Sequence, residues 1–114
     1  KKIKAKDLTY LQKGKKISFI FDTKINSDCE KIAKNSDLLI TESTYTEKEK
    51  DLAREYKHLT AKQAAQIAKK SKSRKLILTH ISQRYENNER VILNEAKKIF
   101  KNTILAVDLM KLEV

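Results

Sequence analysis

The stretch LILTHISQRY, residues 76–85, joins a short apolar run to a group of polar side chains. The run at residues 75–79 is typical of a parallel β-strand that is covered on both faces. It ends at His80, one of two histidines in the chain, and Ser82 and Arg84 follow closely. Functional side chains in α/β proteins gather outside the carboxyl ends of strands. The stretch therefore predicts a buried strand with a functional site at its end.

Two more apolar runs, at residues 17–21 and 37–40, predict further buried strands. Before the first of them, β-prone residues lie on both sides of Gly14. A glycine suits a turn that needs a positive φ, so we expect a hairpin there. Residues 102–114 have the alternation of two short strands.

Three capping boxes predict where helices begin between these strands. They pair Ser27 with Glu30, Thr46 with Glu49, and Thr60 with Gln63. The third box opens a helix with a slim face of alanines, and apolar residues from 92 to 100 predict a last helix. Strands alternate with helices, so we expect an α/β fold with a substantial sheet.

The composition is that of one compact unit of 114 residues, with 39% hydrophobic and 36% charged residues. There is no apolar run of ~20 residues that could cross a membrane, and no signal-peptide pattern, so we expect a cytoplasmic protein. The single cysteine, Cys29, excludes an internal disulfide and offers no cysteine cluster for a metal. The chain opens in mid-element without a clear start, which suggests a segment of something larger.

The formal net charge of +11 allows two interpretations. Basic residues can simply coat the surface, or they can bind a polyanion, because neutralised phosphates release counterions. The lysine-rich run at residues 69–75 has the same two interpretations: a solvated helix end that complements the helix dipole, or a phosphate site.

Four polar side chains lie at or near the ends of the predicted strands and helices. Asp22, Glu42 and His80 each follow an apolar run, and His58 precedes the helix that Thr60 caps. Each has a structural alternative: a turn cap, a solvated loop residue, a helix-end side chain or a packed histidine. Together they predict one site, and carboxylate and imidazole are ligands that zinc or manganese accepts.

The motifs around these residues resemble the ribonuclease Z family. They are Phe21-Asp22-Thr23, residues 41–45 (TESTY), residues 58–61 (HLTA) and residues 78–85 (LTHISQRY). The family consists of metallo-β-lactamase-fold endonucleases that trim the 3′ end of precursor tRNA. The resemblance covers nearly the whole chain, 1–114, and the lysine-rich character is similar to the archaeal branch.

The resemblance implies a role for each residue of the predicted site. Asp22 would bridge two divalent metal ions, zinc or manganese, and His80 would bind one of them. His58 would lie beside the scissile phosphate as the acid for the leaving oxygen, and Glu42 would orient it.

The resemblance also implies contacts to the substrate. Thr60 at a helix N-terminus, together with Ser82 and Arg84, would contact phosphates of the precursor tRNA. One departure from the family is Phe21, which stands where a glycine usually precedes the bridging aspartate.

A larger departure is that the family's H-x-H-x-D-H signature does not occur in the chain. The resemblance is therefore to the C-terminal half of the domain, an αββα sandwich with a mixed sheet flanked by helices. The missing N-terminal half would supply most metal ligands, so we expect the segment alone to be inactive. We expect it to pair with that half, and the whole enzyme to be a homodimer.

Three other interpretations stay open. The chain could belong to another metallo-β-lactamase-fold phosphodiesterase or sulfatase, be a non-catalytic basic RNA-binding module, or be an α/β domain like a response regulator. Substitution of Asp22 or His80 in the complete protein separates the enzyme from the binding module. If activity is lost while tRNA binding persists, the chain belongs to an enzyme.

Overall fold

The computed structural model describes residues 8–12, 15–21 and 23–106. The elements follow in this order: β1 (Leu8–Gln12), β2 (Lys15–Ile20), α1 (Ser27–Ala33), β3 (Leu38–Glu42), η1 (Glu47–Glu49), α2 (Lys50–Glu55), α3 (Ala61–Lys70), β4 (Leu76–Thr79), η2 (Gln83–Tyr85), α4 (Arg90–Lys97) and β5 (Thr103–Leu105). The alternation of strands and helices confirms the predicted α/β class. Among the described residues, no helix is long and apolar enough to cross a membrane.

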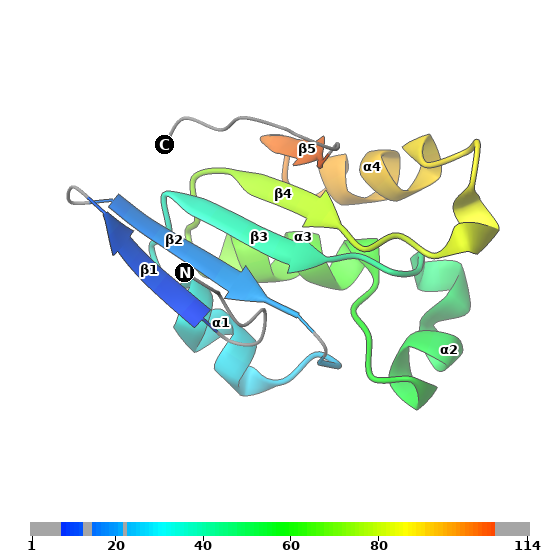
Figure 1. Ribbon diagram of the computed structural model, residues 1–114, viewed down its shortest axis with the longest axis horizontal. Helices are drawn as coiled ribbons and strands as arrows, with labels where there is room; N and C mark the ends of the chain where they lie inside the picture. The colour runs from blue at the N-terminus through cyan, green and yellow to red at the C-terminus, as the bar shows by residue number, and fades with distance from the viewer. Residues whose placement is uncertain (1–7, 13–14, 22, 107–114) are drawn as a thin grey trace.

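The strands form one sheet in the order β1-β2-β3-β4-β5 (Figure 1). Strands β2 to β5 are parallel, and β1 is antiparallel to β2, with Gln12 opposite Lys15. The predicted hairpin is therefore confirmed, although residues 13–14 lie outside the described part. The sheet is mixed only through β1 and is otherwise parallel. Of the two strands expected near the C-terminus, β5 is present and the other lies outside the described residues.

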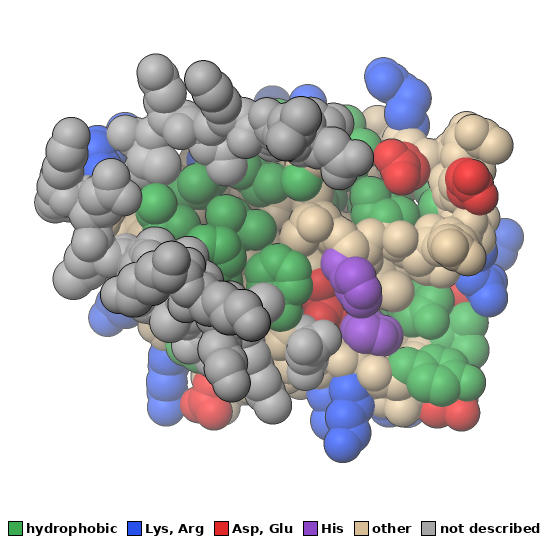
Figure 2. Space-filling model, viewed as in Figure 1, with side chains coloured by type: hydrophobic (Ala, Val, Ile, Leu, Met, Phe, Trp, Pro, Cys, Tyr) green, Lys and Arg blue, Asp and Glu red, His purple; other side chains and the backbone are tan. Residues whose placement is uncertain are grey.

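The helices lie on one face of the sheet. Each parallel strand pairs with the next one in sequence, and right-handed crossovers then put every connecting helix on the same side. Figure 1 shows α1, α3 and α4 behind the sheet. The face turned to the viewer carries apolar side chains (Figure 2), and by strand alternation these include the half-buried Ile17 and Ile40. No described helix covers this face.

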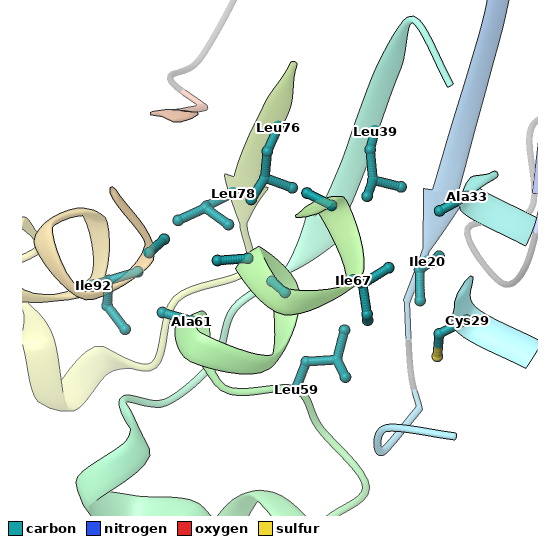
Figure 3. Packing of buried hydrophobic residues seen from close by; sticks show 14 of the residues in the cluster. Ile20, Cys29, Ala33, Leu39, Leu59, Ala61, Ile67, Leu76, Leu78 and Ile92 are labelled. Atoms are coloured by element: carbon teal, nitrogen blue, oxygen red, sulfur yellow. The ribbon is translucent and has the colours of Figure 1, made fainter. Parts of the chain in front are cut away.

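The core lies between the sheet and these helices (Figure 3). Ile20, Leu39, Leu76 and Leu78 point from the strands into a buried cluster with residues of α1, α3 and α4. The alanines of α3 at positions 61, 64, 65 and 68 are fully buried, so the helix packs close to the sheet. This confirms the slim alanine face predicted from the sequence.

Two of the three predicted capping boxes differ from the structure. Helix α1 is capped by Asn26, whose Oδ1 accepts from the Asp28 N–H, while Ser27 is the first helical residue. Asparagine caps as well as serine, and the Asn26 amide also donates to Thr23 Oγ1 and the Lys24 carbonyl, which fixes the loop. Only the box of Thr60 and Gln63 at α3 is complete.

The expected box at Thr46 opens a 3₁₀ turn instead of a long helix. The Thr46 hydroxyl makes no cap bond and donates to the Glu49 carboxylate at 3.2 Å. The Thr46 N–H donates to the Tyr85 hydroxyl at 2.9 Å. Tertiary partners thus replace the local cap.

The amino ends of the parallel strands are joined by buried serines. Ser18 Oγ lies 2.7 Å from Ser36 Oγ, and Ser36 and Ser73 both donate to the carbonyl of Ala33 at the end of α1. Ser71 bonds Ser73 at 2.8 Å. The serines of the lysine-rich run at residues 69–75 are therefore structural.

Candidate active site

The carboxyl ends of β3 and β4 bring Glu42 and His80 to the same edge of the sheet. The two strands are parallel with Glu42 opposite Thr79, so His80 comes one residue beyond this pair. His80 has a φ of 57°. This left-handed conformation is uncommon outside glycine but is enriched at histidine, and it turns the chain out of the sheet.

His58 is placed at this edge by the segment that precedes α3. The His58 N–H donates to the Ala53 carbonyl, which closes the end of α2. The Thr44 N–H then donates to the Leu59 carbonyl at 3.1 Å, and Tyr45 and Thr60 form an isolated parallel bridge. The loop before α3 therefore runs alongside the chain that leaves β3.

The Glu42 carboxylate is the centre of the hydrogen-bond network. Its side chain is fully buried, and Oε2 accepts from His58 Nδ1 at 2.7 Å, from the Leu59 N–H at 3.0 Å and from the Thr44 hydroxyl at 3.2 Å. Because a carboxylate only accepts, the proton of His58 lies on Nδ1, and its Nε2 is left for other partners. This is the arrangement expected when an acidic residue orients a histidine.

Thr44 links the two histidines, a role that the sequence did not reveal. Its hydroxyl donates to Glu42, and it lies 3.2 Å from Nδ1 of His80. A hydroxyl has one proton to donate, so it accepts from His80 Nδ1, and His80 also has its Nε2 left for another partner. The two rings lie with centroids 5.5 Å apart at 53° (Figure 2).

The donor set fits a divalent metal ion at His80. Nitrogen and oxygen atoms of Glu42, His58 and His80 lie within 4.8 Å of one another. However, Glu42 Oε2 already accepts three hydrogen bonds, and Nδ1 of His58 is committed to it. The geometry therefore favours His80 as a metal ligand beside a Glu42–His58 pair over a three-residue metal site. Asp22, the other expected ligand, lies outside the described residues.

The structure gives Thr60 a capping role. Its hydroxyl accepts from the Gln63 N–H, and the Thr60 N–H donates to the Gln63 side chain. The next two N–H groups of α3 donate to the Tyr45 carbonyl and to Glu95. The N–H donors at this helix start thus have partners within the chain, and a phosphate contact at Thr60 stays a prediction.

Ser82 and Arg84 lie beyond His80 on the same edge. The Ser82 N–H donates to the Thr44 carbonyl at 3.0 Å, which ties this loop to the site. Arg84 lies over the ring of Tyr45 at 5.9 Å, and its Nη1 is 3.6 Å from the Glu49 carboxylate. The half-exposed guanidinium is near the site, and its phosphate contact also stays a prediction.

Tyr85 fixes the far end of this loop. Its hydroxyl donates to Glu49 Oε1 at 2.6 Å and accepts from the Thr46 N–H. Burial and the Glu49 bond raise the pKa of Tyr85, which keeps its proton in place. The same hydrogen bond, more than any other contact, lowers the pKa of Glu49.

Glu95 on α4 supports the segment from the other side. Its two carboxylate oxygens accept from the Glu47 N–H at 3.0 and 2.9 Å, and Oε2 accepts from the Lys62 N–H at 2.9 Å. One carboxylate thus holds the starts of η1 and α3, which bracket the loop that carries His58. No local sequence pattern marks this role, because the partners are far apart in the chain.

The fold defines a class of protein, the metallo-β-lactamase fold. The structure matches the metallo-β-lactamase fold protein YhfI from Bacillus subtilis with a TM-score of 0.70 at 22% identity, over 82% of this chain and 37% of that one. At that identity the match shows the fold alone. No family model matches the chain.

Within this class, the chain is similar in sequence to ribonuclease Z. It is 45% identical over 103 residues to ribonuclease Z of Archaeoglobus fulgidus and 47% identical over 104 residues to that of Protochlamydia amoebophila. These matches cover 90% and 91% of the chain and 34% of each relative, so the chain spans about a third of their length. The short form of human tRNase Z has a TM-score of 0.68 and 31% identity over 90% of this chain and 35% of that one.

Proposed function

We propose that the chain is part of a metal-dependent endoribonuclease that hydrolyses precursor tRNA at its 3′ end and leaves a 3′-hydroxyl on the tRNA. The observation that carries the proposal is the hydrogen bond between the buried Glu42 carboxylate and the partly exposed His58, beside His80 at the carboxyl edge of the sheet. The 45% identity to a ribonuclease Z supports the choice of substrate.

His58 is suited to act as the general acid. Glu42 holds the proton on Nδ1 and stabilises the charged ring, so Nε2 can give a proton to the leaving 3′ oxygen. Thr44 and the Leu59 N–H keep the carboxylate in place. Ser82 and Arg84 would hold phosphates of the substrate next to this imidazole, and Thr60 would add a hydroxyl if its cap opened.

His80 and Asp22 would hold divalent metal. When bound, two such ions would activate the attacking water and polarise the phosphate. Catalytic zinc normally has about three protein ligands per ion, so the remaining ligands would come from a part of the enzyme outside residues 1–114. We therefore expect this segment alone to bind metal weakly and to leave precursor tRNA intact.

The test is His58→Gln in the complete protein that contains this chain, assayed on precursor tRNA with zinc or manganese. Loss of a general acid should lower kcat by about 10²–10⁴-fold, while tRNA binding persists. A wild-type protein that binds precursor tRNA without cutting it would support an RNA-binding module instead. Cleavage of an aryl phosphodiester but not of tRNA would support another phosphodiesterase of this fold.

Three further features belong to the same proposal. The metal is zinc, with manganese as the alternative, which metal analysis of the purified enzyme decides. The enzyme works as a homodimer in the cytoplasm, which light scattering and cell fractionation test. The apolar sheet face in Figure 2 supports pairing with the other half of the domain.

A further inference from the structure

A groove opens next to His58 on the side of α2 and α3. It has a volume of about 440 Å³, and its walls come from three segments: the loop after β2, the region of η1 and α2, and the start of α3. This volume is in the range of ~300–1,000 Å³ that ligand sites occupy. His58 itself lines the groove, so the groove and the Glu42–His58 pair share one side chain.

The walls of the groove are strongly basic. They carry Lys24, Lys50, Arg54 and Lys62 against one acid, Glu47. Two of these cations have acidic partners: Lys50 pairs with Glu47 at 3.9 Å and Arg54 with Asp51 at 3.7 Å, and 39% to 88% of each of these side chains is exposed. An exposed pair of this kind contributes at most about 1 kcal/mol. The cations of the groove are therefore free to exchange their present partners for an anion.

Charge alone does not single out this groove. A second one, of about 480 Å³, lies between α1 and the end of α3 and carries Lys31, Lys34, Lys70 and Lys72 with the acid Glu30. The two are alike in size and charge. They differ in that the second lies at the amino end of the sheet, next to the buried serines and away from both histidines.

We propose that the groove beside His58, lined by Lys24, Lys50, Arg54 and Lys62, binds the sugar-phosphate backbone of the RNA strand that passes the scissile bond. The inference rests on the proposed function, since it takes His58 as the residue next to that bond. A chain of phosphates is the ligand that several cations along one groove neutralise best.

Two glutamines make the groove suited to RNA. Gln63 and Gln66 line it on successive turns of α3. The Gln63 side-chain oxygen is used by the Thr60 N–H, so its amide hydrogens are what it offers the groove. An amide hydrogen can donate to a ribose 2′-hydroxyl, the group by which proteins distinguish RNA from DNA.

The test compares two triple variants of the complete protein. Lys50→Gln, Arg54→Gln and Lys62→Gln together neutralise the groove, and Lys31→Gln, Lys34→Gln and Lys70→Gln remove the same charge from the other groove. Binding of fluorescent precursor tRNA is measured without added metal over a range of KCl concentrations. The salt slope should fall by about 0.7 per lost phosphate contact, so by about 2 in the groove variant.

The kinetic result should follow the binding result. The groove variant should show a KM for precursor tRNA raised roughly tenfold or more, with kcat changed much less, since uniform binding is lost. Equal effects in the two triple variants would mean that only net charge matters and would overturn the proposal. If the wild type cleaves tRNA and the groove variant keeps the wild-type salt slope and KM, the groove proposal is overturned and the proposed function stands. A wild type without cleavage would instead refute the proposed function.

Discussion

The two ends of the parallel sheet both bury polar side chains, and they use them in opposite ways. At the amino end, Ser18, Ser36 and Ser73 bond one another or the carbonyls at the end of α1. At the carboxyl end, Glu42 and Thr44 bond two imidazoles. The hydroxyls of the first network bond only to one another and to backbone carbonyls. The second network binds Nδ1 of both histidine rings, so each ring has a fixed orientation.

The difference separates polar groups that hold the fold from polar groups that can react. The serine network satisfies donors that would otherwise be buried without partners, which is costly. The carboxyl-end network fixes the tautomers of His58 and His80 and leaves both Nε2 atoms for a substrate or a metal. The polar side chains at both ends are buried and hydrogen-bonded to a similar degree. The two networks differ in that the one at the carboxyl end contains titratable groups.

The strongest way to test this comparison is Glu42→Gln in the complete protein. The amide cannot accept all three hydrogen bonds of Oε2, so His58 loses its orientation, and we expect kcat to fall roughly 100-fold. Single-turnover cleavage of precursor tRNA measures the effect. Glu55→Gln, an exposed change on α2, is the matched control. Full activity in Glu42→Gln would show that the carboxylate does not direct His58.

At the amino end, Ser36→Ala should affect stability and leave the chemistry alone. It removes a hydroxyl that bonds both Ser18 and the Ala33 carbonyl, so we expect a loss of about 1–3 kcal/mol in the free energy of unfolding. Urea denaturation measures the loss. A fall in kcat of the folded variant would show that the two ends are coupled.

Thr44→Val tests the link between the two imidazoles. Valine keeps the shape of threonine but cannot accept from His80 Nδ1, so His80 should populate both tautomers. We expect the affinity for divalent metal to fall about tenfold. Metal titration measures the affinity, and ¹⁵N NMR of the histidines reports the tautomer. If the His80 spectrum is unchanged, the Thr44 hydroxyl does not determine the tautomer of His80.

The smallest effect should come from Tyr85→Phe, which removes the strongest contact of Glu49. We expect a loss of about 1 kcal/mol of stability at neutral pH. The folded state lowers the pKa of Glu49 below its ordinary 4.5, so this stabilisation is present above pH 4.5 and disappears as the pH falls through the lowered value. The wild type and the variant should therefore converge in acid. If the difference in stability between the wild type and the variant persists at pH 2, it comes from packing of the Tyr85 hydroxyl and not from the ionised Glu49.

Local patterns predicted the strands and the third helix start well. Apolar runs followed by a single polar residue located Glu42 and His80 at strand ends, because parallel strands finish at one edge. The Thr60 capping box also followed from its spacing. Asn26 was missed because four residue types compete for a cap position, and the structure uses the one that also fixes the loop.

The roles of Thr44 and Glu95, and the two basic grooves, could not be predicted in this way. Each depends on contacts between segments that lie far apart in the sequence, such as Thr44 with His80. The lysines of the grooves look the same in the sequence as those of any solvated surface. Only their position relative to His58 distinguishes one groove from the other.

The bonds of Glu95 have a consequence for genetics. This residue lies on α4 and contacts neither histidine, yet its carboxylate fixes the two backbone ends that frame the His58 loop. A random screen for inactive variants should therefore recover position 95 beside positions 42 and 58. An activity assay alone would not distinguish a Glu95 variant from an active-site variant, although the substitution acts by changing the geometry of the His58 loop.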